Sequence, residues 1–180
     1  MDANELGWWG VPLAILGGAI RVGTPLLWVS LGETVTEKAG RINLGLEGTL
    51  LMGAMAAYGT AFVTGNPWLG VLAAAGTGLL LGLLHGLLCS LNRVNDTAMG
   101  IALMLAGSGL AFWLGKPLIQ PSAPDLPALE LGGFTDQPAV RAALAISPLF
   151  VLGLVLAFGV HAALGHTRFG LRLRVVGDSE

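Results

Sequence analysis

The chain has 180 residues, of which 54% are apolar and only 11% are charged, and its mean hydropathy is +0.75. A soluble domain carries about 25% charged residues, so this composition leaves too little polar surface to cover a water-soluble globule. The net charge of −2, with nine dispersed basic residues, excludes a nucleic-acid partner, and the single cysteine excludes a disulfide framework and a cysteine-rich metal site. We therefore predict an all-α membrane protein that is surrounded by lipid and uses no metal ion.

Five stretches are apolar over the roughly 20 residues that a helix needs to cross a bilayer. None of them keeps the regular alternation of apolar and polar residues that is typical of a soluble protein. In chain order they cover about residues 8–31, 44–63, 68–91, 98–115 and 142–164. The sequence therefore predicts a single transmembrane domain over residues 1–180 with about five helices.

The first predicted span contains Arg21 near its middle. A charge at that depth costs several kcal/mol unless it faces a partner or a water-filled cavity. Two interpretations follow. Either Arg21 lies on a translocation path or an interface, or it binds backbone carbonyls of a helix that Gly23 and Pro25 make irregular.

A polar segment, "GETVTEKAGRINLGLEG" at residues 32–48, joins the first and second spans. It is too polar to lie in lipid, and Gly40 interrupts it, so we expect it on the cytoplasmic side or in a re-entrant dip that is sheltered by protein. Glu47 stands near the start of the second span, where the unpaired amides of a helix favour a carboxylate. We predict a constrained helix–loop–helix elbow with a charged lining, to which Glu33, Asn43 and Glu47 contribute.

Small residues recur every four positions in the second and third spans. Because this spacing puts them on one face of a helix, neighbouring backbones can approach closely there. The pattern fits a plain structural bundle as well as a core that carries a path. The predicted packing positions are Gly45, Gly53, Gly78, Gly82 and Gly86.

Two polar residues of the spans suggest other chemistry. His85 could be a proton relay or ligand, or a hydrogen-bonded packing residue. Ser108, in "AGSG", would need a histidine base at its own depth to act as an intramembrane serine protease, and a packing role is the simpler interpretation. The chain has no G-x-x-x-x-G-K-[ST] or H-E-x-x-H motif, so we expect neither its own ATP-binding loop nor that class of zinc protease, and no enzymatic activity.

The distribution of basic residues predicts the orientation. Six of them (Lys38, Arg41, Arg93, Arg168, Arg172 and Arg174) fall on one side if the spans alternate, and only Lys116 and Arg141 fall on the other. The side rich in Lys and Arg is cytoplasmic. We therefore expect a multi-pass protein of the inner or plasma membrane with its N-terminus outside, its C-terminus in the cytoplasm, and a proline-rich extracytoplasmic loop at residues 116–140.

Four segments together resemble a known family. "GETVTEKAGRINLGLEGTLLMGA" at 32–54 is similar to the signature of permease subunits of ABC importers in the simple-sugar and nucleoside branch. "RVGTP" at 21–25 also resembles that family. So does "NDTAMGIALMLAGSGL" at 95–110, with Met104 where the family often has asparagine. The last is "HTRFGLRLRVVGDSE" at 166–180, with Val175 in place of the usual alanine.

The resemblance implies a transmembrane subunit that imports nucleosides or simple sugars without a cofactor. It implies three partners: separate ATPase subunits, an extracytoplasmic substrate-binding protein, and a second permease subunit that is either identical or different. Residues 165–180 would begin the cytoplasmic coupling loop, and Asn95 would join Arg21 on the translocation path. The predicted ATPase-coupling residues are Thr167, Arg168, Phe169, Gly170, Arg172, Arg174 and Gly177.

Members of the family are longer, so we expect this chain to be the N-terminal part of a permease fold, either incomplete at its C-terminus or completed by another polypeptide. We do not expect it to transport by itself. The substrate stays open among ribose, other pentoses and nucleosides. "NLGLEG" at 43–48 favours nucleosides because the sugar branch has a D-L-S-V-G form. The alternative function is a non-transporting membrane scaffold.

Overall fold

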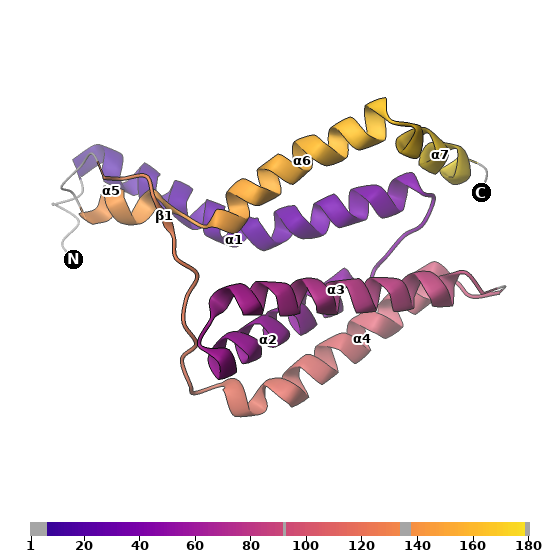
Figure 1. The fold of residues 1–180 in the computed structure, drawn as a ribbon, viewed down its shortest axis with the longest axis horizontal. Coiled ribbons are helices and arrows are strands. Elements are labelled where there is room, and N and C mark those ends of the chain that lie inside the picture. The colour runs from indigo at the N-terminus through magenta and orange to yellow at the C-terminus, as the bar shows by residue number, and fades with distance from the viewer. Residues whose placement is uncertain (1–6, 92, 134–137, 179–180) are drawn as a thin grey trace. The chain divides into compact units, whose positions relative to one another are not determined.

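The computed structural model of the chain describes residues 7–91, 93–133 and 138–178 (Figure 1). Contacts divide the chain into two compact units, Met1–Gly32 with Pro127–Leu171 and Glu33–Leu126 with Arg172–Glu180. The elements are α1 (Gly7–Lys38), α2 (Leu46–Thr64), α3 (Pro67–Cys89), α4 (Asp96–Gly115), the 3-10 helix η1 (Lys116–Leu118), β1 (Leu129–Glu130), α5 (Pro138–Ala143), β2 (Ala145–Ile146), α6 (Pro148–His166) and α7 (Arg168–Gly177).

Among the described residues, five helices are long and apolar enough to cross a membrane, namely Val11–Lys38, α2, α3, Asp96–Leu118 and α6. This confirms the predicted all-α membrane class. Most large apolar side chains on these helices are exposed; Val63 and Leu80, for example, are 80% and 69% exposed. Such side chains have a favourable environment in lipid or against other protein surfaces.

The ends of two helices differ from the prediction. α1 continues past Leu31 to Lys38, because an α-helix satisfies its own backbone hydrogen bonds and can therefore extend beyond its apolar part. α6 begins at Pro148 rather than near residue 142. The hydroxyl of Ser147 accepts the amide of Leu149 at 3.3 Å, and proline suits the first position of a helix.

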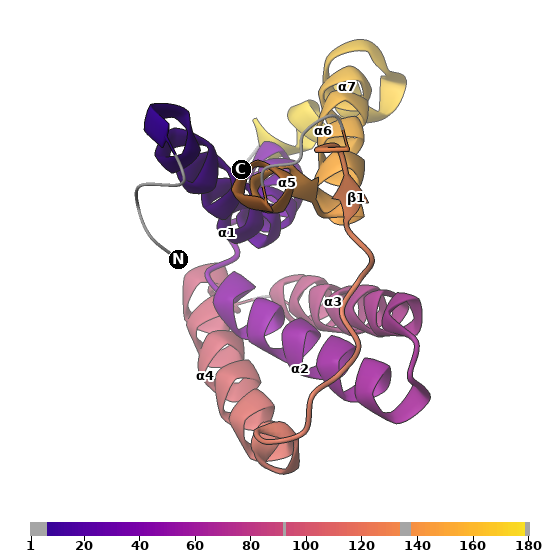
Figure 2. The same cartoon turned by 90° about the vertical axis from the view of Figure 1, so that its left-hand side faces the viewer.

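In the second unit, α2 lies against both α3 and α4 (Figures 1 and 2). Only Gly65 and Asn66 separate α2 from α3. Gly65 has a φ of +68°, which glycine adopts readily, and the side chain of Asn66 accepts the amide of Trp68 at 2.9 Å. The turn predicted at Gly65-Asn66-Pro67 is confirmed.

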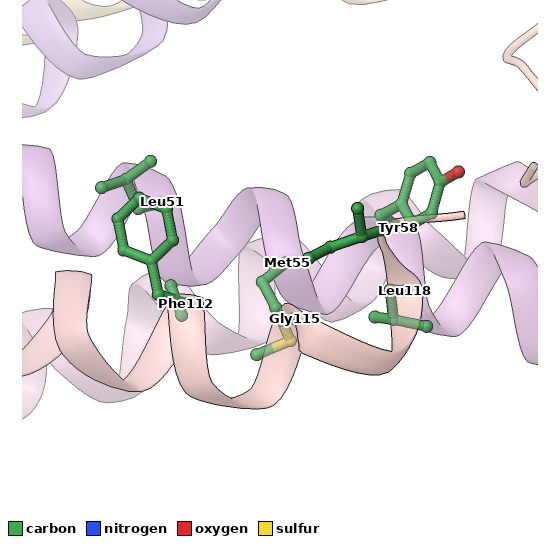
Figure 3. A pocket seen from close by; sticks show the side chains of 8 residues that line it. Leu51, Met55, Tyr58, Phe112, Gly115 and Leu118 are labelled. Atoms are coloured by element: carbon green, nitrogen blue, oxygen red, sulfur yellow. The ribbon is translucent and has the colours of Figure 1, made fainter. Parts of the chain in front are cut away.

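The segment after α4 returns along α2. The hydroxyl of Tyr58 donates to the carbonyl of Pro121 and accepts the amide of Ala123, so this proline-rich stretch is fixed to α2. An apolar pocket of about 330 Å³ lies beneath it, between α2 and the end of α4 (Figure 3). Its lining residues are Leu51, Met55, Tyr58, Ala111, Phe112, Gly115, Leu118 and Ile119.

In the first unit, α1 touches the beginning of α6. The indole nitrogen of Trp28 donates to the carbonyl of Leu149 at 3.1 Å, and a methyl group on Gly153 would lie 2.7 Å from the side chain of Leu27. β1 and β2 form a two-residue antiparallel pair within the stretch predicted to be loop and span start, with Leu129 opposite Ile146. Pairs this short cannot be recognised from alternation, which needs about four residues.

Candidate elbow and coupling sites

The elbow consists of Ala39–Gly45, between α1 and α2. It begins with a tight turn in which the amides of Ala39 and Gly40 donate to the carbonyls of Thr36 and Glu37, both at 3.0 Å. Gly40 has a φ of +79°, which is the left-handed conformation that commonly ends a helix. Glycine is required here because a side chain would be strained in that conformation. The predicted break at Gly40 is confirmed.

Glu33 and Asn43 meet across the elbow. The amide of Asn43 donates to Oε1 of Glu33 at 3.1 Å, and Oδ1 of Asn43 accepts the amide of Gly45 at 2.8 Å. Oε2 of Glu33 is buried and has no hydrogen-bond partner among the described residues. Two of the three predicted elbow residues therefore lie in one hydrogen-bonded group. Glu47 is instead exposed in the first turn of α2.

Arg41 connects the elbow to the turn between α3 and α4. Its Nη1 lies 3.1 and 3.2 Å from the two carboxylate oxygens of Asp96 and 3.3 Å from the carbonyl oxygen of Cys89. The Asp96 side chain is only 18% exposed, so water screens this ion pair less than one on the surface. Sequence reasoning did not single out Arg41 and Asp96 as site residues. The available sequence signal was the "ND" at residues 95–96, which opens the motif of the fourth span.

Asn95 begins α4. Its Oδ1 accepts the amide of Ala98 at 3.0 Å, which is the hydrogen bond of a helix N-cap, and the residue is exposed. This contact gives Asn95 a structural role. Its place on a translocation path stays a prediction.

The predicted packing glycines fall into two groups. A methyl group on Gly45 would lie 3.0 Å from the carbonyl oxygen of Gly100 in α4, and one on Gly53 would meet Ala74 of α3 at 3.8 Å. In contrast, a methyl group on Gly78, Gly82 or Gly86 would meet nothing in the described structure within 4 Å. The described structure places no neighbour on those three, so their packing role stays a prediction.

A further close helix contact involves Gly107, which sequence reasoning did not assign to packing. A methyl group on Gly107 of α4 would lie 2.8–3.0 Å from three backbone atoms of Gly48 in α2. A methyl group on Gly48 would be equally close to the backbone of Leu103 and Met104. The backbones of α2 and α4 are therefore in direct contact. Both glycines lie within the quoted motifs, but the spacing of small residues did not reveal that they face each other.

Arg21 binds a backbone carbonyl. Its guanidinium donates to the carbonyl of Ala142 at 2.8 Å, within the first unit, and the residue is exposed. One interpretation from the sequence was binding to backbone carbonyls, but the carbonyl belongs to α5 rather than to an irregular turn of α1. A role for Arg21 on the path stays a prediction.

Neither polar residue of the spans shows catalytic geometry. The hydroxyl of Ser108 donates to the carbonyl of Met104 at 2.7 Å, the usual bond of a small polar residue within an apolar helix. His85 is 5% exposed, and its Nε2 lies 3.6 Å from the sulfur of Cys89 one turn away. These contacts correspond to packing roles for both residues.

α7 follows α6 after a sharp bend at Thr167. The amide of Gly170 donates to the hydroxyl of Thr167 at 3.2 Å, and a methyl group on Gly170 would overlap the carbonyls of Ala163 and Leu164. Only glycine fits so close to the end of α6, which explains the glycine of the T-R-F-G segment. The side chains of Arg168, Phe169, Arg172 and Arg174 are exposed on α7. α7 thus presents cationic and apolar groups on one short helix.

Comparison with known proteins adds a family match. Residues 15–180 match the family model described as "Branched-chain amino acid transport system / permease component". No solved structure matches significantly.

Several relatives have names that describe transport, among them the following three. The chain is 30% identical to a guanosine ABC transporter permease of Bacillus subtilis, over 86% of this chain and 52% of the relative. It is 30% identical to a nucleoside ABC transporter permease of Lactococcus lactis, over 92% and 56%. It is 36% identical to a Haloferax volcanii protein provisionally named as a glucose ABC transporter permease, over 64% and 35%. The chain therefore spans about a third to just over half of the length of these relatives.

Proposed function

Because this chain belongs to the family of permease components of the branched-chain amino acid transport systems, we propose that it forms part of the transmembrane subunit of an ABC importer for nucleosides. The observation that carries the proposal is the family match over residues 15–180, which includes every predicted span but the start of the first. The five apolar helices and the elbow support it.

Nucleosides are the proposed substrate class. Two relatives that match 86% and 92% of this chain at 30% identity are named for guanosine and nucleosides, and "NLGLEG" favours the same branch. Glucose and galactofuranose occur in the names of other relatives, so simple sugars are the competing class. Both classes present several hydroxyl groups, and a nucleoside adds an aromatic base that can stack on side chains.

Three partners complete the proposed importer. Separate ATPase subunits would bind α7 from the cytoplasm, which requires the C-terminus inside and the N-terminus outside. A second permease subunit would cover the exposed apolar faces, including the side of α3 that carries Gly78, Gly82 and Gly86. A substrate-binding protein would deliver the solute at the outer surface. Transport would proceed by alternating access, with ATP binding favouring one conformation.

We expect the full-length protein that contains this chain to co-purify with the ATPase subunit encoded beside it, and the complex to take up radiolabelled guanosine. Excess unlabelled adenosine should suppress uptake at least tenfold more effectively than excess ribose or glucose, because stacking of a base on an aromatic side chain contributes about 1–3 kcal/mol that a sugar cannot supply. Uptake by proteoliposomes that contain the binding protein is the measurement.

Two other outcomes would change the proposal. Suppression by glucose or ribose but not by adenosine would move the substrate to simple sugars. A folded protein that retains no ATPase and takes up neither class would instead be the scaffold that the sequence leaves as an alternative.

A further inference from the structure

The last turn of α7 lies in backbone contact with the elbow. A methyl group on Gly177 would lie 2.6 Å from the carbonyl oxygen of Lys38 and 2.9 Å from the amide nitrogen of Gly40. A methyl group on Gly40 would in turn lie 3.0 Å from Cα of Gly177. These neighbours are backbone atoms and cannot rotate away, so the contact has no flexible side chain in it.

The next residue of the elbow holds the bundle of α2, α3 and α4. Arg41 binds the carboxylate of Asp96, the first residue of α4, and the carbonyl of Cys89, the last residue of α3. Two consecutive residues, Gly40 and Arg41, therefore connect the end of α7 to the turn between α3 and α4. All of these contacts lie within the second unit.

We propose that Gly177, Gly40, Arg41 and Asp96 transmit displacement of α7 to the start of α4, so that the elbow is the element that converts ATPase movement into movement of the helix bundle. This inference rests on the proposed function, in which α7 binds the ATPase. It assigns Gly177 to the elbow rather than to the ATPase surface. The four are positioning residues, which act on the path through the helices that they hold.

Rigidity is the physical reason for choosing these contacts. Close-packed backbone atoms transmit displacement because they cannot compress. The mostly buried carboxylate of Asp96, which contacts Arg41 through both of its oxygens, holds the guanidinium at the other end of this connection. If either connection is loosened, ATP hydrolysis continues but moves the bundle less, so less solute is carried for each ATP.

The first test is Gly177→Ala in the complete transporter with its ATPase and binding protein. The matched control is Gly159→Ala in α6, where a methyl group meets nothing within 4 Å. We expect Gly177→Ala to retain the ATPase and to hydrolyse ATP while uptake per ATP falls about tenfold, and the control to behave as wild type. Loss of the ATPase, or unchanged uptake per ATP, would overturn the inference.

The second test is a double-mutant cycle on Arg41→Gln and Asp96→Asn, which replace each charged side chain with a neutral polar one. Each single change should lower uptake per ATP by about fivefold, and the double change should be no worse than the singles because the ion pair between Arg41 and Asp96 is lost in all three. Arg41→Lys should restore part of the coupling. The control cycle is Arg141→Gln with Glu130→Gln, an exposed ion pair at 3.8 Å in the first unit, which should change nothing.

Additive losses in the Arg41 and Asp96 cycle would overturn the inference, as would effects of equal size in the control cycle. The wild-type complex separates this result from the proposed function. If wild type retains no ATPase, the proposed function fails. If wild type is coupled and the variants are too, only the assignment of the elbow fails.

Discussion

Replacing both Arg168 and Arg172 with glutamate is expected to weaken retention of the ATPase subunit by roughly a hundredfold and to abolish uptake. The two arginines lie four residues apart on α7, which puts them on the same face of the helix, and both are exposed. Reversal changes that face from doubly positive to doubly negative. An ATPase surface that attracts cations would then repel it.

The measurement is the amount of ATPase that remains bound to the tagged, detergent-solubilised permease, together with uptake in proteoliposomes. The matched control replaces Lys116 and Arg141 with glutamate. This changes the net charge by the same amount, but these two residues stand on the other predicted side of the membrane. The control should retain its ATPase. Wild-type retention and uptake in the Arg168 and Arg172 variant would refute the docking role of α7.

Replacing Gly107 with leucine is expected to separate α2 from α4 and to leave little folded protein. Even one methyl group would overlap backbone atoms of Gly48 at 2.8–3.0 Å, and overpacking by a few carbons costs about 1–3 kcal/mol or more. In lipid this loss is serious, because close backbone approach replaces the hydrophobic drive that holds soluble helices together.

Gly109→Leu is the control, since Gly109 lies in the same helix and a methyl group there meets nothing within 4 Å. Thermal stability and monodisperse yield in mild detergent are the measurements. The melting temperature should fall by several degrees or more for Gly107→Leu and stay near wild type for Gly109→Leu. Equal behaviour of the two variants would mean that α2 and α4 do not touch at Gly48 and Gly107.

Much of the fold was predictable because it depends on local composition. Apolar runs of about 20 residues predict the spans, and Gly65-Asn66-Pro67 predicts a turn from the conformations of those residues alone. Gly40 predicts the break after α1 for the same reason. The limit of α1 was wrong, because the helix continues beyond its apolar part and hydropathy does not report where a helix in water ends.

The partners of the site residues were not predictable in this way. Arg41 and Asp96 are 55 positions apart in the sequence, and nothing local to either residue names the other. Glycine spacing marks a face of a helix without saying what lies on it. Gly53 and Gly82 therefore looked alike, although only Gly53 has a neighbouring helix in the described structure. Long-range contacts in the folded chain determine which residues lie against such a glycine.

The two-residue connection between α2 and α3 has a consequence for biogenesis. Gly65 and Asn66 can span only about 7 Å, whereas the hydrocarbon core is about 30 Å thick. One helix therefore cannot stay on the near surface of the bilayer while the other crosses. The two must enter the bilayer together, as a helical hairpin, during synthesis. In the predicted orientation this turn is the tip that is carried across, and its glycine and asparagine are uncharged, so the insertion machinery would move almost no charge through the lipid.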